Sequence, residues 1–191
     1  MNRGSVMGKI VLVTGGARSG KSRFAERYAA RYGKNIAYIA TAGLYDEEMA
    51  FRVKLHRERR PASWKTWEAP YDAHEALKEA GEAHDMVLFD CLTLYISNIL
   101  CAVEDISDSA RNYRLVREQV CKLIAQAEEN AGTAIFVTNE VGAGIVPENQ
   151  LSREYRDVVG IANQLMGRAA ENVYLVTCGL AVDIKKLGEM V

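Results

Sequence analysis

The chain has 191 residues, with 24 Lys and Arg against 25 Asp and Glu, and a formal net charge of −1. With 49% hydrophobic and 26% charged residues, its composition is that of a globular protein and excludes an intrinsically disordered chain. The near-neutral charge argues against a general nucleic-acid binder. No apolar run approaches the roughly 18–20 residues of a membrane helix, so we expect a cytoplasmic protein without a membrane span.

The length suits one compact domain. We expect a short N-terminal extension, residues 1–8, followed by a single domain over residues 9–191, because no linker, repeat or low-complexity tract interrupts the chain. The cysteines form no C-x-x-C pair and have no histidine at metal-ligand spacing. We therefore expect reduced, buried thiols at all four positions: Cys91, Cys101, Cys121 and Cys178.

Short apolar runs alternate with longer helical patterns along the chain. In chain order we expect a strand at 9–14, a helix at 21–32, a strand at 35–40, helices at 46–60 and 72–80, a strand at 86–89, helices at 92–100 and 109–129, a strand at 134–138, a helix at 151–172 and a strand at 173–177. This alternation predicts an α/β fold, with a mostly parallel central sheet and helices on both faces. Ligands of such sheets bind where the strands end at their carboxyl edge.

The segment between the first strand and the first helix matches the phosphate-loop pattern G-x-x-x-x-G-K-[ST]. Its glycines let successive backbone N–H groups converge on phosphate oxygens, and the helix N-terminus adds partial positive charge. Lys21 can reach the β- and γ-phosphates, and Ser22 can bind Mg²⁺. The alternative is a chance glycine-rich turn. The expected nucleotide-binding residues are Gly15, Gly16, Ala17, Arg18, Ser19, Gly20, Lys21 and Ser22.

An acidic residue follows the apolar run Met86–Phe89. Asp90 then lies at the carboxyl end of a buried strand, where the Walker-B acid of a phosphate-loop protein holds Mg²⁺ directly or through water. The alternative is that Asp90 only caps the helix that begins after it. The two roles are compatible.

A histidine lies in the basic half of the predicted helix 46–60. Arg52, His56 and Arg60 are spaced i, i+4, i+8 and share one helical face. Neighbouring cations lower the pKa of an imidazole and favour its neutral, nucleophilic form. Such a group can attack phosphorus while the arginines stabilise the phosphate charge. The alternative is a solvated basic helix end; we expect the other histidines, His74 and His84, to be surface residues.

Together these residues resemble the bifunctional adenosylcobinamide kinase/adenosylcobinamide-phosphate guanylyltransferases of cobalamin biosynthesis. The resemblance covers essentially residues 9–187. The phosphate loop alone is shared by many functions, so the other segments carry the specificity. The matching segments are 13–22, 38–42, Glu48-Met49-Ala50 leading to His56, Arg60-Pro61, 64–66, 90–93, 138–142, 145–149, Arg153, Arg156-Asp157 and Asn163-Gln164.

The resemblance implies a phosphate-loop NTPase fold of the RecA-like type and two reactions. The first phosphorylates adenosylcobinamide with ATP or GTP. The second transfers GMP from GTP to adenosylcobinamide phosphate through a guanylyl-histidine, which corresponds to His56, and releases adenosylcobinamide-GDP and pyrophosphate. It also implies a homotrimer, while Mg²⁺ bound with the nucleotides is expected from the phosphate loop and Asp90. Beyond the phosphate loop, the implied nucleotide contacts are Thr41, Ala42, Gly43, Glu58, Arg59, Arg60, Pro61, Glu68 and Asp90; Ser22 and Asp90 are the expected metal ligands.

Residues 139–149 form a loop that borders the predicted site, since they follow the strand 134–138. Gly142 and Gly144 would let this loop move, or it is a plain flexible turn. Arg153, Arg156 and Asp157 either contact substrate or form salt bridges on a helix surface.

Three other functions remain open at this point. A simpler small-molecule kinase would have no use for His56. A GTPase switch is disfavoured, because the chain has no Asn-Lys-x-Asp run for guanine selection. A nonenzymatic nucleotide-sensing module would show no turnover with a corrinoid substrate.

Overall fold

The computed structural model describes residues 7–43, 61–130 and 132–189. The predicted helix at 46–60 therefore lies outside the described residues, and the division into an extension and one domain stays a prediction. The described elements, in chain order, are β1 (Lys9–Thr14), α1 (Lys21–Tyr32), β2 (Ile36–Ala40), β3 (Lys65–Glu68), α3 (Ala73–Ala83), β4 (Met86–Asp90), α4 (Leu92–Cys101), α5 (Ser109–Glu129), β5 (Thr133–Val137), α6 (Gln150–Ala169), β6 (Asn172–Thr177), β7 (Leu180–Asp183) and the 3₁₀ turn η1 (Ile184–Lys186).

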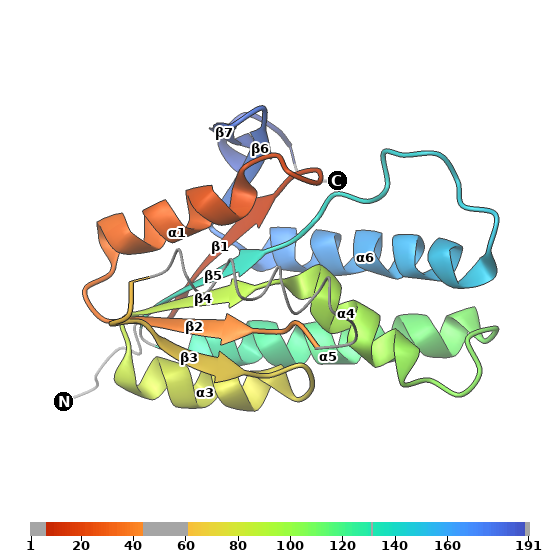
Figure 1. The fold of residues 1–191 in the computed structure, drawn as a ribbon, viewed down its shortest axis with the longest axis horizontal. Coiled ribbons are helices and arrows are strands. Elements are labelled where there is room, and N and C mark those ends of the chain that lie inside the picture. The colour runs from red at the N-terminus through yellow and green to blue at the C-terminus, as the bar shows by residue number, and fades with distance from the viewer. Residues whose placement is uncertain (1–6, 44–60, 131, 190–191) are drawn as a thin grey trace.

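The described strands form one sheet in the order β3-β2-β4-β5-β1-β6-β7. Every neighbouring pair is parallel except β6 and β7, which are antiparallel. Figure 1 shows α1 on one side of this sheet and the long helices α5 and α6 on the other. The α/β fold with a mostly parallel sheet is thus confirmed.

The two faces of the sheet carry separate apolar cores, because successive side chains of a strand point to opposite faces. Val11, Val13 and Leu88 pack with Ala25 and Ala29 of α1. The alternate residues of the same strands, Ile10, Leu12, Val87 and Phe89 among them, pack with buried side chains of α3, α4, α5 and α6. Burial on both faces explains why β1, β4 and β5 appear in the sequence as continuous apolar runs.

The sequence did not predict the two edge strands. β3 has the sequence Lys-Thr-Trp-Glu and is mostly exposed, so it lacks the apolar run of a central strand. β7 follows a two-residue turn in which Cys178 has φ 51° and Gly179 has φ 77°. Two positive φ values suit a tight hairpin, but Cys-Gly is not a usual signal for it. The predicted helix 151–172 was too long: α6 ends at Ala169, and β6 begins at Asn172.

All four cysteines are free, as expected, but only Cys91 is buried; Cys101, Cys121 and Cys178 are exposed. The prediction of four buried thiols was therefore wrong for three of them. Among the described residues, no helix combines the length and the apolar character required to cross a bilayer.

Candidate functional site: the carboxyl edge of the sheet

The phosphate-loop segment connects β1 to α1, and its backbone requires glycine at two points. Gly20 has φ 99° and stands at the N-cap of α1, a conformation that side chains disfavour. A Cβ on Gly15 would lie 2.3 Å from the Val176 carbonyl oxygen and 2.8 Å from Ser19 Oγ. The first strand, the loop and β6 are therefore too close together for any larger residue at Gly15.

Lys21 opens α1 with its ammonium folded over the loop, where Nζ donates to the Gly16 carbonyl at 3.2 Å. Burial lowers the pKa of Lys21 below its ordinary value of 10.5, and the charges of Cys91 and Asp90 partly oppose this shift. Among described residues, the ammonium forms no ion pair. A partly desolvated cation at a helix N-terminus attracts an anionic ligand.

Asp90 ends β4, which is separated from β1 in the sheet by β5 alone. Its Oδ2 accepts a hydrogen bond from the Tyr38 hydroxyl at 3.0 Å. The N-cap of α4 is Cys91, and no side chain caps it. Asp90 therefore does not cap α4.

The donor set at this edge fits Mg²⁺. The Ser22 hydroxyl and the Asp90 carboxylate both supply oxygen, which Mg²⁺ prefers, and Mg²⁺ takes its remaining ligands from phosphates and water. Ser22 lies in the first turn of α1 and is half-buried, as is Asp90. The described residues contain no cluster of three or more His, Cys, Asp or Glu side chains that could hold a metal by themselves.

Thr41, the first residue after β2, is fully buried. Its hydroxyl donates to the Cys91 carbonyl at 2.8 Å and accepts from the Cys91 N–H at 2.8 Å. Its own carbonyl accepts from Asn98 Nδ2 at 2.8 Å. The side chain predicted to contact nucleotide thus joins the end of β2 to the end of β4. Ala42 and Gly43 are half-buried, while Glu68, at the end of β3, and Pro61 are exposed.

A second set of polar side chains joins the ends of β4 and β5. Asn139 Nδ2 donates to Thr93 Oγ1 at 3.0 Å, and Thr93 Oγ1 lies 3.1 Å from Cys91 Sγ. Asn163 of α6 accepts from the Thr138 hydroxyl at 2.7 Å and donates to the Asn139 carbonyl at 3.1 Å. Burial and the nearby Asp90 raise the pKa of the Cys91 thiol to about 11, so this thiol is no nucleophile at neutral pH.

Sequence reasoning gave no site role to Thr93 or Asn98, although a signal for both was present. Each is a polar residue inside the mostly apolar helix Leu92–Cys101, and both are buried. A buried polar side chain costs free energy unless it is hydrogen-bonded. Such residues in an apolar helix therefore indicate a built polar contact.

The loop 139–149 is tied to the phosphate loop at its start. The Glu140 N–H donates to the Gly15 carbonyl at 3.1 Å, and the Gly142 N–H donates to Glu140 Oε1 at 2.7 Å. Arg156 Nη2 donates to the Gly142 carbonyl at 2.6 Å, and Arg153 donates to the Pro147 and Glu148 carbonyls. Both arginines thus hold backbone carbonyls of the loop, a role the sequence did not predict. Asp157 is exposed.

Part of the predicted site lies outside the described residues, namely Arg52, His56, Glu58, Arg59 and Arg60. The other histidines are half-buried rather than on the surface. His84 Nδ1 lies 2.9 Å from the Ala80 carbonyl oxygen, and its ring stands edge-on to Trp67.

Of the predicted site residues that are described, the phosphate loop, Thr41, Glu68 and Asp90 lie along one edge of the sheet.

Comparisons with known proteins point to one family. A family model described as cobinamide kinase / cobinamide phosphate guanyltransferase matches residues 11–184. The chain is 39% identical to a bifunctional adenosylcobalamin biosynthesis protein CobU of Salmonella typhimurium and 38% identical to the CobU of Escherichia coli, each over 92% of this chain and 99% of the relative. It is 41% identical to the bifunctional adenosylcobalamin biosynthesis protein CobP of Pseudomonas aeruginosa, over 91% of this chain and 96% of that protein.

Proposed function

The chain belongs to the cobinamide kinase / cobinamide phosphate guanyltransferase family, and from this premise we propose that it is a bifunctional kinase and guanylyltransferase of adenosylcobalamin biosynthesis. It phosphorylates adenosylcobinamide with ATP or GTP, and then transfers GMP from GTP to adenosylcobinamide phosphate. The observation that carries the proposal is the match of nearly the whole chain to this family. The phosphate-loop pattern after β1 and the acidic end of β4, at the same edge of the sheet, support it. We place the reactions in the cytoplasm.

In the kinase step, the chain mainly positions the triphosphate and stabilises its charge. The loop residues Gly15–Ser22 hold the phosphates, and Lys21 faces the transferred γ-phosphoryl group. The acceptor hydroxyl oxygen attacks the γ-phosphorus and gives up its proton to solvent, the bond to the β,γ-bridging oxygen breaks, and the nucleoside diphosphate leaves. Mg²⁺, when bound with the nucleotide, neutralises charge on the phosphate oxygens; Ser22 and Asp90 are the residues that would hold it.

In the second step, His56 is the nucleophile. A neutral imidazole nitrogen attacks the α-phosphorus of GTP, a P–N bond forms, and pyrophosphate leaves. An oxygen of adenosylcobinamide phosphate then attacks the same phosphorus, the P–N bond breaks, and adenosylcobinamide-GDP is released. Arg52 and Arg60, on the same predicted helical face, stabilise the phosphate charge. Thr41, Ala42, Gly43, Glu58, Arg59, Pro61 and Glu68 complete the proposed nucleotide contacts.

The test is covalent labelling of the protein by α-labelled GTP and Mg²⁺. Digestion under mildly alkaline conditions spares the P–N bond, so mass spectrometry should find a guanylyl group on the peptide that contains His56. His56→Ala should abolish this label and the formation of adenosylcobinamide-GDP. Kinase activity should persist at least in part, because the phosphate loop and Asp90 are unchanged.

His74→Ala is the matched control, since it removes another imidazole but should keep the label and both activities. A label on Lys21 or another lysine, or full guanylyltransferase activity in His56→Ala, would overturn the histidine mechanism. Kinase activity without any labelling of the wild type would favour a simpler kinase. Absence of all turnover with corrinoid substrate would favour a nucleotide-sensing module.

We also propose a homotrimer, as the resemblance implies. The outer edge of the sheet offers an apolar surface for self-association, because β7 is an edge strand with exposed aliphatic side chains. Leu175 and Val182 are paired across β6 and β7, and Leu180 lies on the same face. Their exposed fractions are 38%, 46% and 70%. Sedimentation equilibrium on the full chain distinguishes a trimer from a monomer or dimer.

A further inference from the structure

One buried asparagine joins the segments that follow two neighbouring strands, β2 and β3. Asn98 lies in the middle of α4 and is only 2% exposed. Its side-chain amide donates to the Thr41 carbonyl at 2.8 Å and to the Pro70 carbonyl at 2.9 Å. Both protons of the amide are therefore used, on two segments that are 28 and 57 residues away in the chain. An apolar residue would pack in this helix without the desolvation cost of a buried amide.

The two carbonyls lie just beyond the point where neighbouring strands separate. β2 and β3 are paired up to Ala40 and Glu68, and the Ala69 N–H still donates to the Ala40 carbonyl at 2.8 Å. Beyond this bond, Thr41 turns toward β4, where its N–H donates to the Asp90 carbonyl at 3.3 Å. Pro70 leads toward α3. The two donor bonds of Asn98 thus fix the distance between the end of β3 and the joined ends of β2 and β4.

We propose that Asn98 is a positioning residue for nucleotide binding, which acts by holding Thr41 and Glu68 in place relative to Asp90. This inference rests on the proposed function. The ends of β2 and β3 lie three and four strands from β1 in the sheet, or roughly 14 and 19 Å at about 4.8 Å per strand. A triphosphate held by the phosphate loop does not extend that far. Asn98 therefore acts on the part of the ligand beyond the phosphates.

This placement predicts a ligand-selective defect. In Asn98→Leu, which keeps the branched shape of the side chain and removes both donors, the affinity for GTP should fall about tenfold, equivalent to about 1.4 kcal/mol. The affinity for inorganic tripolyphosphate should stay unchanged, because only the phosphate loop binds it. Isothermal titration calorimetry with each ligand and Mg²⁺ measures both values. Asn98→Ser, which keeps one donor, gives a milder second variant and should show the same selectivity if the leucine variant does not fold.

Asn112→Leu is the matched control. Asn112 is also fully buried, but it lies on α5, and its amide donates to the Ile106 carbonyl at 2.9 Å and to Glu154 Oε2 of α6 at 3.4 Å. Both leucine variants should lose thermal stability, and only the Asn98 variants should lose GTP affinity. Equal weakening of GTP and tripolyphosphate, or unchanged GTP affinity in folded Asn98 variants, would overturn the positioning role alone. A wild type that binds neither ligand would overturn the proposed function and this inference with it.

Discussion

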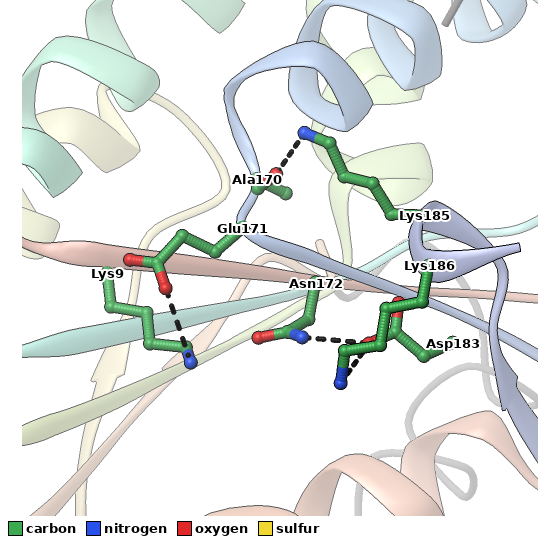
Figure 2. A network of polar contacts seen from close by, with 7 residues as sticks. All are labelled: Lys9, Ala170, Glu171, Asn172, Asp183, Lys185 and Lys186. Carbon is green, nitrogen blue, oxygen red and sulfur yellow. Dashed lines mark hydrogen bonds and ion pairs between the residues drawn. The ribbon is translucent and has the colours of Figure 1, made fainter. Parts of the chain in front are cut away.

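The charged side chains at the two edges of the sheet differ in the partners they contact. At the amino edge, charged side chains compensate one another, as Figure 2 shows. Lys9 pairs with Glu171 at 3.4 Å, and Asp183 accepts from Asn172 at 2.8 Å and pairs with Lys186 at 3.1 Å. Lys185 donates to the last carbonyls of α6, including those of Gly167 and Arg168 at 3.0 Å. This edge also contains a hollow of about 430 Å³ between α1 and β6, whose lysines are already paired.

At the carboxyl edge, the charges of Lys21 and Asp90 are not compensated by ion pairs among the described residues. The Lys21 ammonium is partly desolvated and contacts only a carbonyl among described residues, while Asp90 contacts a neutral tyrosine. The polar side chains that form hydrogen bonds here, such as those of Thr41 and Asn98, bond to backbone groups and not to charged side chains. Paired charges stabilise the folded chain, whereas charges without an ion pair among the described residues are available to a ligand at some cost in stability. Substitutions at the two edges should therefore separate activity from stability.

Lys21→Ala gives the largest expected effect on function. Loss of a charge-assisted contact should weaken nucleotide binding by about 1.5–3 kcal/mol and lower turnover in both reactions on the order of 1000-fold, because the contact strengthens in the transition state. Stability without ligand should be unchanged or higher, because burial disfavours the Lys21 ammonium. Calorimetric titration with GTP, both activity assays and thermal unfolding measure this. Normal nucleotide affinity in the variant would remove the phosphate loop from the mechanism.

Asp90→Asn should lower both activities at least roughly 100-fold and raise the Mg²⁺ concentration needed for half-maximal rate, because the variant loses the charge that draws the metal. The melting temperature should change little, because an asparagine oxygen can still accept from Tyr38. Tyr38→Phe is the control: it removes the hydrogen bond and keeps the carboxylate, so its Mg²⁺ dependence should stay near that of the wild type. A large loss of stability with normal Mg²⁺ dependence in Asp90→Asn would show a structural role instead.

The central strands and the phosphate loop were predictable because their signals are local. β1, β4 and β5 are buried on both faces and contain continuous apolar runs, and the loop pattern itself predicts a position between a strand and a helix. The edge strands β3 and β7 were not predictable, because their partners are set by tertiary pairing and their sequences are polar or follow an unusual turn. The contacts of Asn98 and Arg156 join segments distant in the chain, which no local pattern encodes.

Gly15→Ala tests how closely the phosphate loop is packed. A Cβ at this position meets the backbone carbonyl of Val176, which cannot move aside as a flexible side chain would. We expect a loss of about 1–3 kcal/mol in unfolding free energy without ligand, measured by urea denaturation. Gly16→Ala is the matched control, because no heavy atom lies within 4 Å of its Cβ position, and it should stay within about 0.5 kcal/mol of the wild type. Equal stability of the two variants would contradict the close packing of Gly15.

Asp183→Asn should give the smallest effect, on stability alone. Burial raises the pKa of Asp183, but the bonds from Asn172 and Lys186 and the Lys186 charge outweigh this and hold the pKa below its ordinary 3.8. The unfolded chain therefore takes up this proton first as the pH falls. The stabilisation is complete above pH 3.8 and is lost as the pH falls through the lowered pKa. At pH 7 the variant should melt about 2 °C lower than the wild type, and the difference should shrink below pH 4 in a series of thermal melts. GTP affinity should be unchanged, since the charge lies at the amino edge; a loss of affinity, or a stability difference that does not depend on pH, would contradict the separation of the two edges.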